Sequence, residues 1–381
     1  MNVPLYKQIY KNVLNQIIRG ELKKGQKIPS EKDLAKQFDV SRITSKKALD
    51  LLAQNKIIER VQGKGSFVIY SNETTITTSN SDLGNAEIKI LKIGLVITDI
   101  SDSYGTELIK VVESNVGIYG AQLLIKFTHE MIENEEKAIT ELLQVGVDGM
   151  IVLPIHGELY NPKILELVLQ KFPIVLVDRY LRGIPASSVS TNNMQAAREA
   201  TDYLISLGHQ HIAYITLPYD GTTVLEDRMK GYQLAHTKRK LPLNPDYLFT
   251  NNASEVAYKP TKSEELNKEL AKIKKFIMDN PDITAFFVCR YSFGEILAHV
   301  IHSMNKRVPE DYSIICFDSP PSVFAKPRFT HVHQKEDKLG EKAVQILMAQ
   351  ILGERDILTE FMDFDLVEGL STASIKLEMK N

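Results

Sequence analysis

The stretch from residue 26 to 68 restricts the fold of this 381-residue chain more than any other part. Ser30 and Ser41 each precede a short segment with apolar residues at helical spacing, and a serine at that place caps the first turn of a helix. Two strand-like runs then flank Gln62-Gly63-Lys64-Gly65, whose glycines allow a tight turn. The stretch therefore predicts two short helices followed by a glycine-tipped hairpin.

An apolar stripe from Leu5 to Arg19 predicts a further helix before this stretch, and the hairpin strands are expected at 57–60 and 66–69. Three helices and a hairpin make a winged helix-turn-helix. In that arrangement the third helix enters the major groove of DNA with its N-terminus first. The hairpin, or wing, would lie near the minor groove or the phosphates.

The third helix is expected to carry most of the contacts with bases. An arginine in its first turn, here Arg42, can donate two hydrogen bonds to guanine O6 and N7. The apolar residues of this helix are Ile43, Ala48, Leu49 and Leu52. The residues predicted to contact DNA are Glu31, Lys32, Arg42, Thr44, Ser45, Lys46, Gln62, Gly63, Lys64 and Gly65.

The charges are divided unevenly along the chain. Residues 1–70 contain 14 lysines and arginines against 6 aspartates and glutamates, whereas the remainder contains 32 against 42. A basic head on an acidic body indicates that only the head meets a polyanion. A solvated lysine surface would give the same count, so the charge alone leaves both interpretations open.

The composition is that of an ordinary soluble protein, with 43% hydrophobic and 25% charged residues. Cys289 and Cys316 lie in apolar runs and are expected in the core, and the nine histidines lack metal-ligand spacing. We expect neither a metal nor a cofactor, since Gly63-x-Gly65 lacks the third glycine of a dinucleotide motif. The N-terminus does not resemble a signal peptide, and no apolar run approaches the roughly 20 residues that span a membrane, so a cytoplasmic location is predicted.

Beyond about residue 88, strands and helices alternate, which predicts an α/β body with parallel sheets built by right-handed crossovers. The expected strands are 90–97, 122–127, 149–153, 174–177, 212–215, 285–288 and 313–317. The expected helices are 104–117, 133–144, 161–170, 192–207, 224–238, 263–279 and 292–304.

Ligands of such sheets bind beyond the carboxyl ends of the strands. Carboxylates and guanidinium groups hydrogen-bond sugar hydroxyls, and aromatic rings cover the apolar face of a sugar. The candidate effector-binding residues at these positions are Asp99, Tyr104, His156, Asp178, Arg179, Arg228, Tyr291 and Asp318. No Ser-His-Asp order stands out among them, so the chain is not expected to be an enzyme.

The head resembles the N-terminal domain of GntR-family transcription regulators over residues 4–68. The match rests on Pro29-Ser30-Glu31, Val40-Ser41-Arg42 and Gly63-Lys64-Gly65-Ser66-Phe67-Val68, among others. This resemblance implies a DNA-reading winged helix-turn-helix. The family usually has arginine where Lys46 stands, and lysine lacks the bidentate geometry of arginine. A degenerate winged helix that serves only dimerisation is the alternative.

The body resembles the effector domain of the lactose/galactose-repressor family, which is itself similar to periplasmic sugar-binding proteins. Val177-Asp178-Arg179, Arg228-x-x-Gly231-Tyr232 and Phe317-Asp318 carry the match, which extends over most of residues 90–381. The resemblance implies a two-lobed domain in which the positions of Asp178, Arg228 and Asp318 contact the effector. Tyr291-Ser292 stands where the family usually has Asn-Asp.

A head and body of these two kinds together are similar to the arabinose-repressor family of Gram-positive bacteria. The resemblance implies a repressor that binds palindromic operator DNA as a homodimer through its effector domain and is released by a small sugar, with L-arabinose the leading effector. The alternative is a sugar-binding protein or sugar-modifying enzyme with a vestigial head. The expected domains are a head (1–70), a flexible linker (71–88) and an effector and dimerisation domain (89–381), with lobe one at 89–190 and 320–352 and lobe two at 191–319 and 353–381.

Overall fold

The computed structural model describes most of the chain. The described residues are 5–18, 21–54, 57–61, 63–69, 90–155, 161–218, 221–251, 263–322 and 324–375. Gln62, His156 and the predicted linker at 71–88 lie outside these ranges, so the predictions made for them stay predictions.

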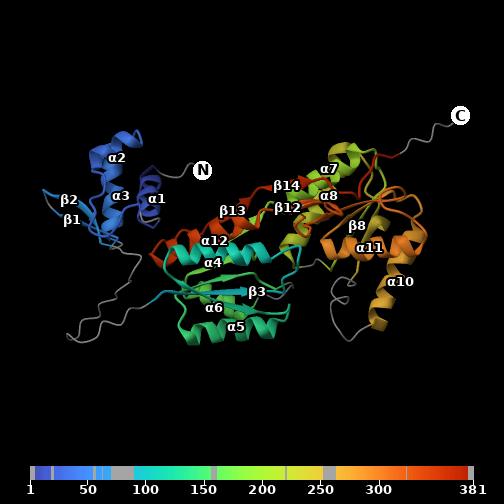
Figure 1. The fold of residues 1–381 in the computed structure, drawn as a ribbon, viewed down its shortest axis with the longest axis horizontal. Coiled ribbons are helices and arrows are strands. Elements are labelled where there is room, and N and C mark those ends of the chain that lie inside the picture. Colours follow the sequence, from blue (N-terminus) through green and yellow to red (C-terminus); the bar gives the residue numbers. More distant parts are fainter. Residues whose placement is uncertain are drawn as a thin grey trace.

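The head has the predicted three helices and hairpin (Figure 1). Its elements are α1 (Leu5–Ile18), α2 (Glu31–Gln37), α3 (Arg42–Gln54), β1 (Ile58–Val61) and β2 (Gly65–Val68). Ser30 caps α2 through a capping box, because its hydroxyl accepts from the Asp33 backbone N–H at 3.3 Å and the Asp33 carboxylate accepts from the Ser30 backbone N–H at 3.1 Å. The three helices enclose a small core whose fully buried members include Ile9, Val13, Leu34, Ala48, Leu49 and Leu52.

The segment before α2 extends the hairpin on its second strand. The Ile28 backbone N–H donates to the Ser66 carbonyl, and the Val68 N–H donates to the Gln26 carbonyl, each at 3.0 Å. Lys27 consequently stands beside Phe67 as an isolated bridge. This pairing was not predicted, because a three-residue segment carries no periodicity of its own.

The first sheet of the body has the strand order β13-β7-β6-β5-β3-β4, with every neighbouring pair parallel. Its strands are β3 (Lys92–Ile97), β4 (Gln122–Phe127), β5 (Gly149–Val152), β6 (Ile174–Val177), β7 (Ser187–Thr191) and β13 (Thr359–Met362). One face is covered by α4 (Thr106–Ile118) and α12 (Glu336–Ile351), and the other by α5 (Ile132–Val145) and α6 (Pro162–Leu169) (Figure 1).

The second sheet has the order β14-β12-β11-β10-β8-β9, parallel except for the antiparallel pair β12–β14. Its strands are β8 (Ile212–Thr216), β9 (Leu248–Thr250), β10 (Ala285–Val288), β11 (Ser313–Phe317), β12 (Thr330–Gln334) and β14 (Phe364–Val367). Helices α7 (Asn193–Ser206) and α8 (Thr223–Arg239) pack on one face, while α10 (Ser263–Asp279) and α11 (Tyr291–Ser303) pack on the other. A 3-10 turn, η1 (Pro245–Tyr247), precedes β9.

The chain crosses between the two sheets at three places: after β7, between β12 and α12, and between β13 and β14. These crossings correct the expected lobe segments at two points. β12 falls within 320–352 but pairs with β11 of the second sheet, and β13 falls within 353–381 but pairs with β7 of the first. Periodicity identifies a strand but not its partner, and short strands next to a crossover can join either sheet.

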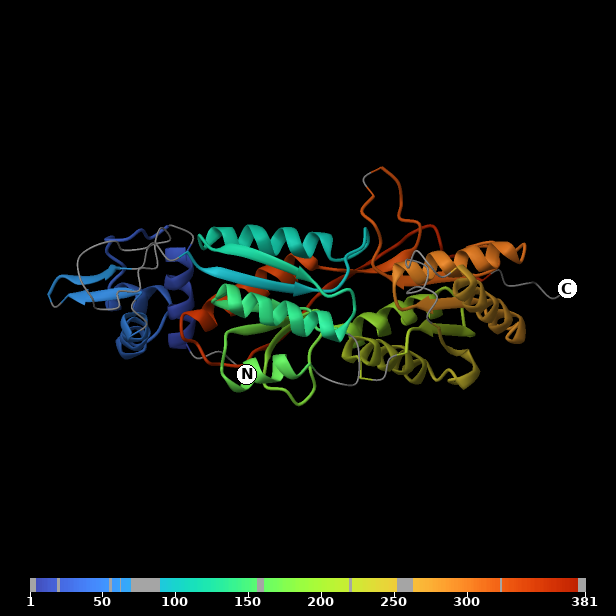
Figure 2. The same ribbon diagram turned by 90° about the horizontal axis from the view of Figure 1, so that it is seen from below.

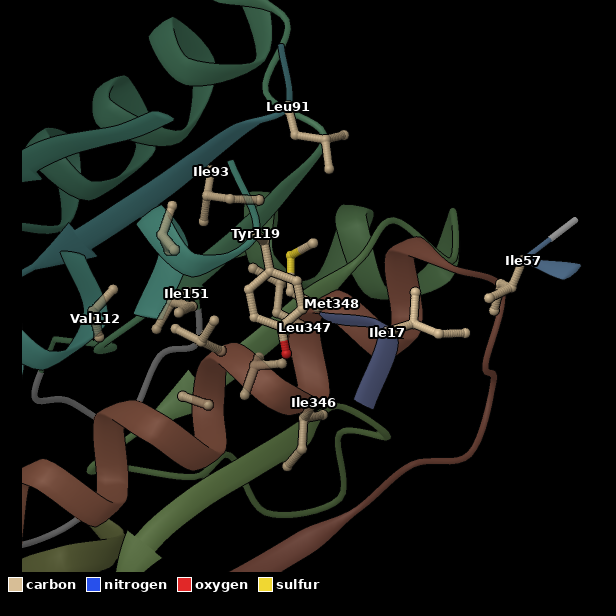
Figure 3. Close-up of a cluster of buried hydrophobic side chains, with 14 of the residues drawn as sticks. Ile17, Ile57, Leu91, Ile93, Val112, Tyr119, Ile151, Ile346, Leu347 and Met348 are labelled. Carbon is tan, nitrogen blue, oxygen red and sulfur yellow. The ribbon is translucent and has the colours of Figure 1, made fainter. Parts of the chain in front are cut away.

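An apolar cluster continues from the first sheet into the head (Figure 3). Ile17 of α1 and Ile57, just before β1, lie at the end of the first lobe where α12 finishes. There the cluster contains Tyr119, Leu347 and Met348. Figures 1 and 2 show the head at this end of the body, on the side away from the second sheet.

The contact between α7 and α8 depends on a glycine. A Cβ atom at Gly231 would lie 2.2 Å from the Met194 carbonyl oxygen and 2.8 Å from the Arg198 backbone nitrogen. Gly231→Ala should therefore push the two helices apart and lower the free energy of unfolding by about 1–3 kcal/mol. Urea denaturation followed by circular dichroism measures this change.

Gly117 in α4 is the matched control, since nothing lies within 4 Å of a Cβ placed there. Gly117→Ala should stabilise the protein by roughly 0.5–1 kcal/mol, because alanine loses less backbone entropy in a helix. Equal denaturation midpoints for the two variants would contradict the close approach of α7 and α8.

Candidate DNA interface and effector cleft

The first turn of α3 presents cations at an exposed helix N-terminus. Arg42 and Lys46 are exposed, and the first turn contains no acidic residue. Ser41 holds this end, because its hydroxyl accepts from the Thr44 backbone N–H at 3.2 Å and lies 2.9 Å from the Thr44 hydroxyl. The arrangement suits a helix that meets phosphates and base edges with its N-terminus first.

Two residues of α3 lie differently from what the sequence indicated. Ser45 is fully buried, and its hydroxyl donates to the Ser41 carbonyl at 3.2 Å, so it packs inside the head rather than facing DNA. Ile43 is 80% exposed, whereas Ala48, Leu49 and Leu52 of the same helix are buried. Within a single turn of a helix, some side chains face the core and others face solvent. The residues from 42 to 46 form too short a pattern to predict which of them face the core.

The wing carries two exposed lysines. Gly63 and Gly65 have φ angles of +74° and +117°, which is the left-handed region that the tight turn requires. Lys64 lies exposed between them. The side chain of Lys27 crosses Gly65 so closely that a Cβ there would be 2.6 Å from Lys27 Cε. Lys27 was not among the predicted DNA residues, because only its pairing with β2 brings it to the wing.

Glu31 belongs to an ion network inside the head. Its carboxylate pairs with Arg60 of β1, and Arg60 also pairs with Asp50 of α3. These ion pairs link α2, α3 and β1, and they hold α3, the helix expected to contact bases, against the wing. Lys32, the next residue, is exposed.

In the body, side chains from both sheets meet where β6 and β11 end. Tyr104 donates a hydrogen bond of 2.9 Å to Asp178, both on the first-sheet side. On the second-sheet side, the Gln334 amide donates to Asp318 at 2.9 Å. These residues and Arg228 form the cleft cluster, which is partly or wholly buried.

Arg228 is positioned by neutral groups. Its guanidinium donates to the Asn193 side-chain oxygen at 2.8 Å and to the Cys289 carbonyl at 2.7 Å. The guanidinium carbon also lies 3.5 Å from the centroid of the Phe317 ring. The planar group is thus fixed in orientation by stacking and by two hydrogen bonds.

The carboxylates of the cleft cluster influence one another across the two lobes. Burial raises the pKa of Asp318 to about 7. The Arg228 charge and the Gln334 hydrogen bond lower this pKa, whereas the charges of Glu336 and Asp178 raise it further. Burial, followed by the charges of Asp178, Glu336 and Asp318, also raises the pKa of Tyr104 well above its usual value. The tyrosine is therefore a hydrogen-bond donor at neutral pH.

Of three other predicted effector residues, Arg179 lies beside this cluster, with its Nε 3.8 Å from the Asp178 carboxylate, whereas Asp99 and Tyr291 have partners outside it. Arg179 donates to the Pro154 carbonyl at 2.6 Å and to Glu130 at 3.3 Å. Asp99 is exposed and pairs with His129 at 2.5 Å. Tyr291 packs its ring edge-on against Phe329, with centroids 5.4 Å apart, and burial together with the Glu295 charge raises its pKa.

Arg179 also lines a small hollow between the two lobes with a cavity volume of about 20 Å³, enough for roughly one water molecule. Glu135 forms one wall and accepts from the Ile155 backbone N–H and the Asn161 amide, at 2.9 and 2.7 Å. Thr222 and Thr223 of the second lobe form the other side.

Sequence reasoning assigned no role to Gln334, Glu336 or Asn193. The oxygen of the Gln334 amide is buried, and it has no hydrogen-bond partner among the described residues. Glu336 accepts from the Gly105 and Leu108 backbone N–H groups at 2.8 and 3.0 Å, which caps α4 from the start of α12. Recognition of β12 as a strand would have identified Gln334, since it is the last residue of that strand.

Within the described ranges, no three His, Cys, Asp or Glu side chains are grouped so that they could hold a metal ion. None of the described helices is both long and apolar enough to cross a membrane.

Comparison with known families identifies both parts of the chain. The profile of the gntR family of bacterial regulatory proteins matches residues 5–68, and that of the periplasmic binding protein-like domain matches residues 201–372. The chain joins a GntR-type helix-turn-helix domain to a periplasmic-binding-protein-like effector domain. Both predicted resemblances are thereby confirmed.

The similar proteins include bacterial repressors and other transcription regulators. The arabinose metabolism transcriptional repressor of Geobacillus stearothermophilus is 28% identical over 359 residues, 93% of each chain. The ribose operon repressor of Halalkalibacterium halodurans is 28% identical over 306 residues, 77% of this chain and 86% of the repressor. Transcription regulator CcpA of Lactococcus lactis matches in structure with a TM-score of 0.64 at 22% identity, over 74% of this chain and 100% of CcpA. The structural match establishes the fold of the body.

The raised pKa of Asp318 predicts a dependence of stability on pH. Its folded-state pKa of about 7 exceeds the ordinary value of 3.8, so between these values the folded protein holds a proton that the unfolded chain has released. Stability from this group is therefore full at low pH and is lost as the pH rises to about 7. Asp318→Asn, which cannot ionise, should gain stability relative to wild type by about 2 kcal/mol between pH 5.5 and 7.

Urea denaturation of both proteins at pH 5.5, 6.5, 7 and 8 measures the difference. The two stability curves should diverge as the pH rises through 7 and become parallel only from about pH 8. Curves that are parallel from pH 5.5 onward would show that Asp318 ionises at an ordinary pKa.

Proposed function

We propose that this protein is a sugar-responsive transcriptional repressor that acts on DNA in the cytoplasm. The observation that carries the proposal is the cleft cluster, in which Tyr104 and Asp178 of one lobe meet Arg228 and Asp318 of the other behind a winged helix-turn-helix head. The similar repressors of arabinose and ribose genes support a sugar as the effector.

The effector that fits the cleft cluster is an uncharged polyol. Asp178, Asp318 and Glu336 offer carboxylate oxygens that accept hydrogen bonds from hydroxyl groups, and Arg228 offers donors. A phosphate group would face Asp178, Glu336 and the ionised fraction of Asp318, whose pKa is about 7, and like charges in a buried site repel strongly. We therefore expect a free sugar, with L-arabinose the first to test, in preference to a sugar phosphate.

Contacts between the lobes supply a closed arrangement for the sugar to stabilise. Tyr180, which follows β6, donates to Asp227 of α8 at 2.7 Å, and the Thr223 hydroxyl donates to the Tyr180 carbonyl at 2.8 Å. Arg182 pairs with both Glu226 and Asp227. A sugar held by both lobes favours the closed arrangement, and closure that repositions the head lowers its affinity for the operator.

The body also offers a surface for a second copy of the chain. β4 is an edge strand, and its Ile125 and Phe127 are exposed, as are Met131 just beyond it and Ile118 at the end of α4. Exposed apolar side chains along an unpaired edge are typical of an interaction site. A symmetric dimer formed through the body would place two heads on a palindromic operator.

Addition of L-arabinose should weaken operator binding by roughly 5- to 150-fold, the range of common allosteric couplings. Gel-shift titrations use the full-length protein and a duplex that it selects from random-sequence DNA, with pentoses, hexoses and their phosphates added one at a time. Asp178→Asn, which loses the carboxylate that accepts from Tyr104, should bind the same DNA but respond less to the sugar. Unchanged affinity with every sugar would contradict an effector role, and conversion of the sugar would favour an enzyme.

Two substitutions in the head should separate specificity from affinity. Arg42→Ala removes a residue placed to read bases, so its binding should weaken more on the selected operator than on random DNA. Lys64→Ala removes a wing cation, so both affinities should fall by a similar factor and the salt dependence should become shallower. Fluorescence anisotropy at several salt concentrations measures both effects, and equal losses for Arg42→Ala on the two DNAs would count against its base-reading role.

A further inference from the structure

Ile43 is an apolar side chain that lies mostly in solvent in the free protein. It is 80% exposed, although it lies in the helix that supplies much of the head's core. A single exposed apolar residue is ordinary on a protein surface. The position of Ile43, rather than its exposure alone, indicates a role.

Helix geometry places Ile43 on the outward side of α3. Ser45, Ala48, Leu49 and Leu52 are buried and define the inward face. At 100° per residue, a side chain two positions before Ser45 points about 160° away from it. Ile43 also belongs to the first turn, directly after Arg42, and Lys46 follows it by one turn on the outward side.

Charged residues further along the outward side of α3 are held by the head itself. The Lys47 ammonium lies 4.1 Å from the centroid of the Tyr6 ring of α1. Asp50 pairs with Arg60. The tip of the helix therefore presents Arg42, Ile43 and Lys46 as its leading side chains.

We propose that Ile43 determines operator sequence by packing against the C5-methyl group of a thymine in the major groove. Thymine is the one base that displays a methyl group there, and apolar side chains recognise it by direct contact. Isoleucine suits this contact because its β-branched side chain has one strongly preferred rotamer in a helix, so little entropy is lost on binding. The inference rests on the proposed binding of operator DNA by the head. It adds an apolar contact as a determinant of operator sequence, beside the charged and hydrogen-bonding residues.

The test removes the thymine methyl group without changing any hydrogen bond of the base. Full-length protein first selects duplexes from random-sequence DNA, and each thymine of the selected site is then replaced by deoxyuridine, which lacks only the methyl. For the wild-type protein, replacement of one particular thymine in each half-site should weaken binding by about four-fold. This factor corresponds to the burial of one methyl-sized group. Ile43→Ala should bind the parent duplex about four-fold more weakly and bind both duplexes equally.

Two further variants make the result specific. Ile43→Val retains the β-branch and should keep the preference for thymine over deoxyuridine. Ile69→Ala removes another exposed isoleucine of the head, at the base of the wing, and should leave both affinities unchanged. Unchanged thermal unfolding of Ile43→Ala verifies that the head remains folded.

Three results would overturn the proposal. If no thymine of the selected site is sensitive to deoxyuridine, the methyl is not read. If Ile43→Ala keeps the thymine preference of wild type, another residue reads it. If the full-length protein enriches no sequence at all, operator binding itself fails and the proposal fails with it, an outcome that the first selection round separates from the other two.

Discussion

Helix α12 is the element on which the rest of the body depends, because both lobes and the head meet along it. Gln334, two residues before the helix, holds Asp318 of the second lobe. Glu336, its first residue, caps α4 of the first lobe through two backbone N–H groups. Met348 near its other end lies in the apolar cluster that reaches Ile17 of the head (Figure 3). A helix of 16 residues spans about 24 Å, so one rigid segment connects the cleft with the head.

This arrangement gives the proposed sugar response a physical basis. The two ends of α12 cannot move independently, since an unbroken helix transmits displacement along its axis. A sugar that changes the separation of the lobes acts on Asp318 and Gln334, and thus on the start of α12. The cluster around Met348 joins the first lobe directly to the head. Coupling by this route requires two discrete arrangements of the lobes, and the contacts of Tyr180 and Arg182 with α8 define one of them.

Much of the fold could be predicted from sequence, because most elements are long enough to show a period. The buried strands at 93–97 and 313–317 and the helices around them fall where the alternation placed them. The strands that were not predicted, β7, β9, β12, β13 and β14, are three to five residues long, and several lie beside the crossings between sheets. Their positions depend on partners far away in the sequence, which no local pattern encodes.

The same limit applies to the candidate site. Asp178 and Asp318 could be predicted because each directly follows a recognisable buried strand, whereas Gln334 follows one that was not recognised. On α3, the inward position of Ser45 and the outward position of Ile43 depend on the exact phase of the first turn. That phase is set by Ser41, whose hydroxyl caps the helix, and by the packing of Ala48 and Leu49 against α1 and α2.

The two cleft aspartates occupy equivalent places in the two lobes, and their backbones are strained in the same way. The Asp178 N–H donates to the Val189 carbonyl of the next strand, and the Asp318 N–H donates to the Val332 carbonyl, each at 2.8 Å. Directly after this last sheet hydrogen bond, both residues adopt positive φ angles, 66° and 61°. Such a conformation costs a non-glycine residue on the order of 1 kcal/mol and persists where the surrounding structure imposes it. The left-handed turn ends each strand abruptly, and the two carboxylates, one from each sheet, lie close enough that the Asp178 charge contributes to the raised pKa of Asp318.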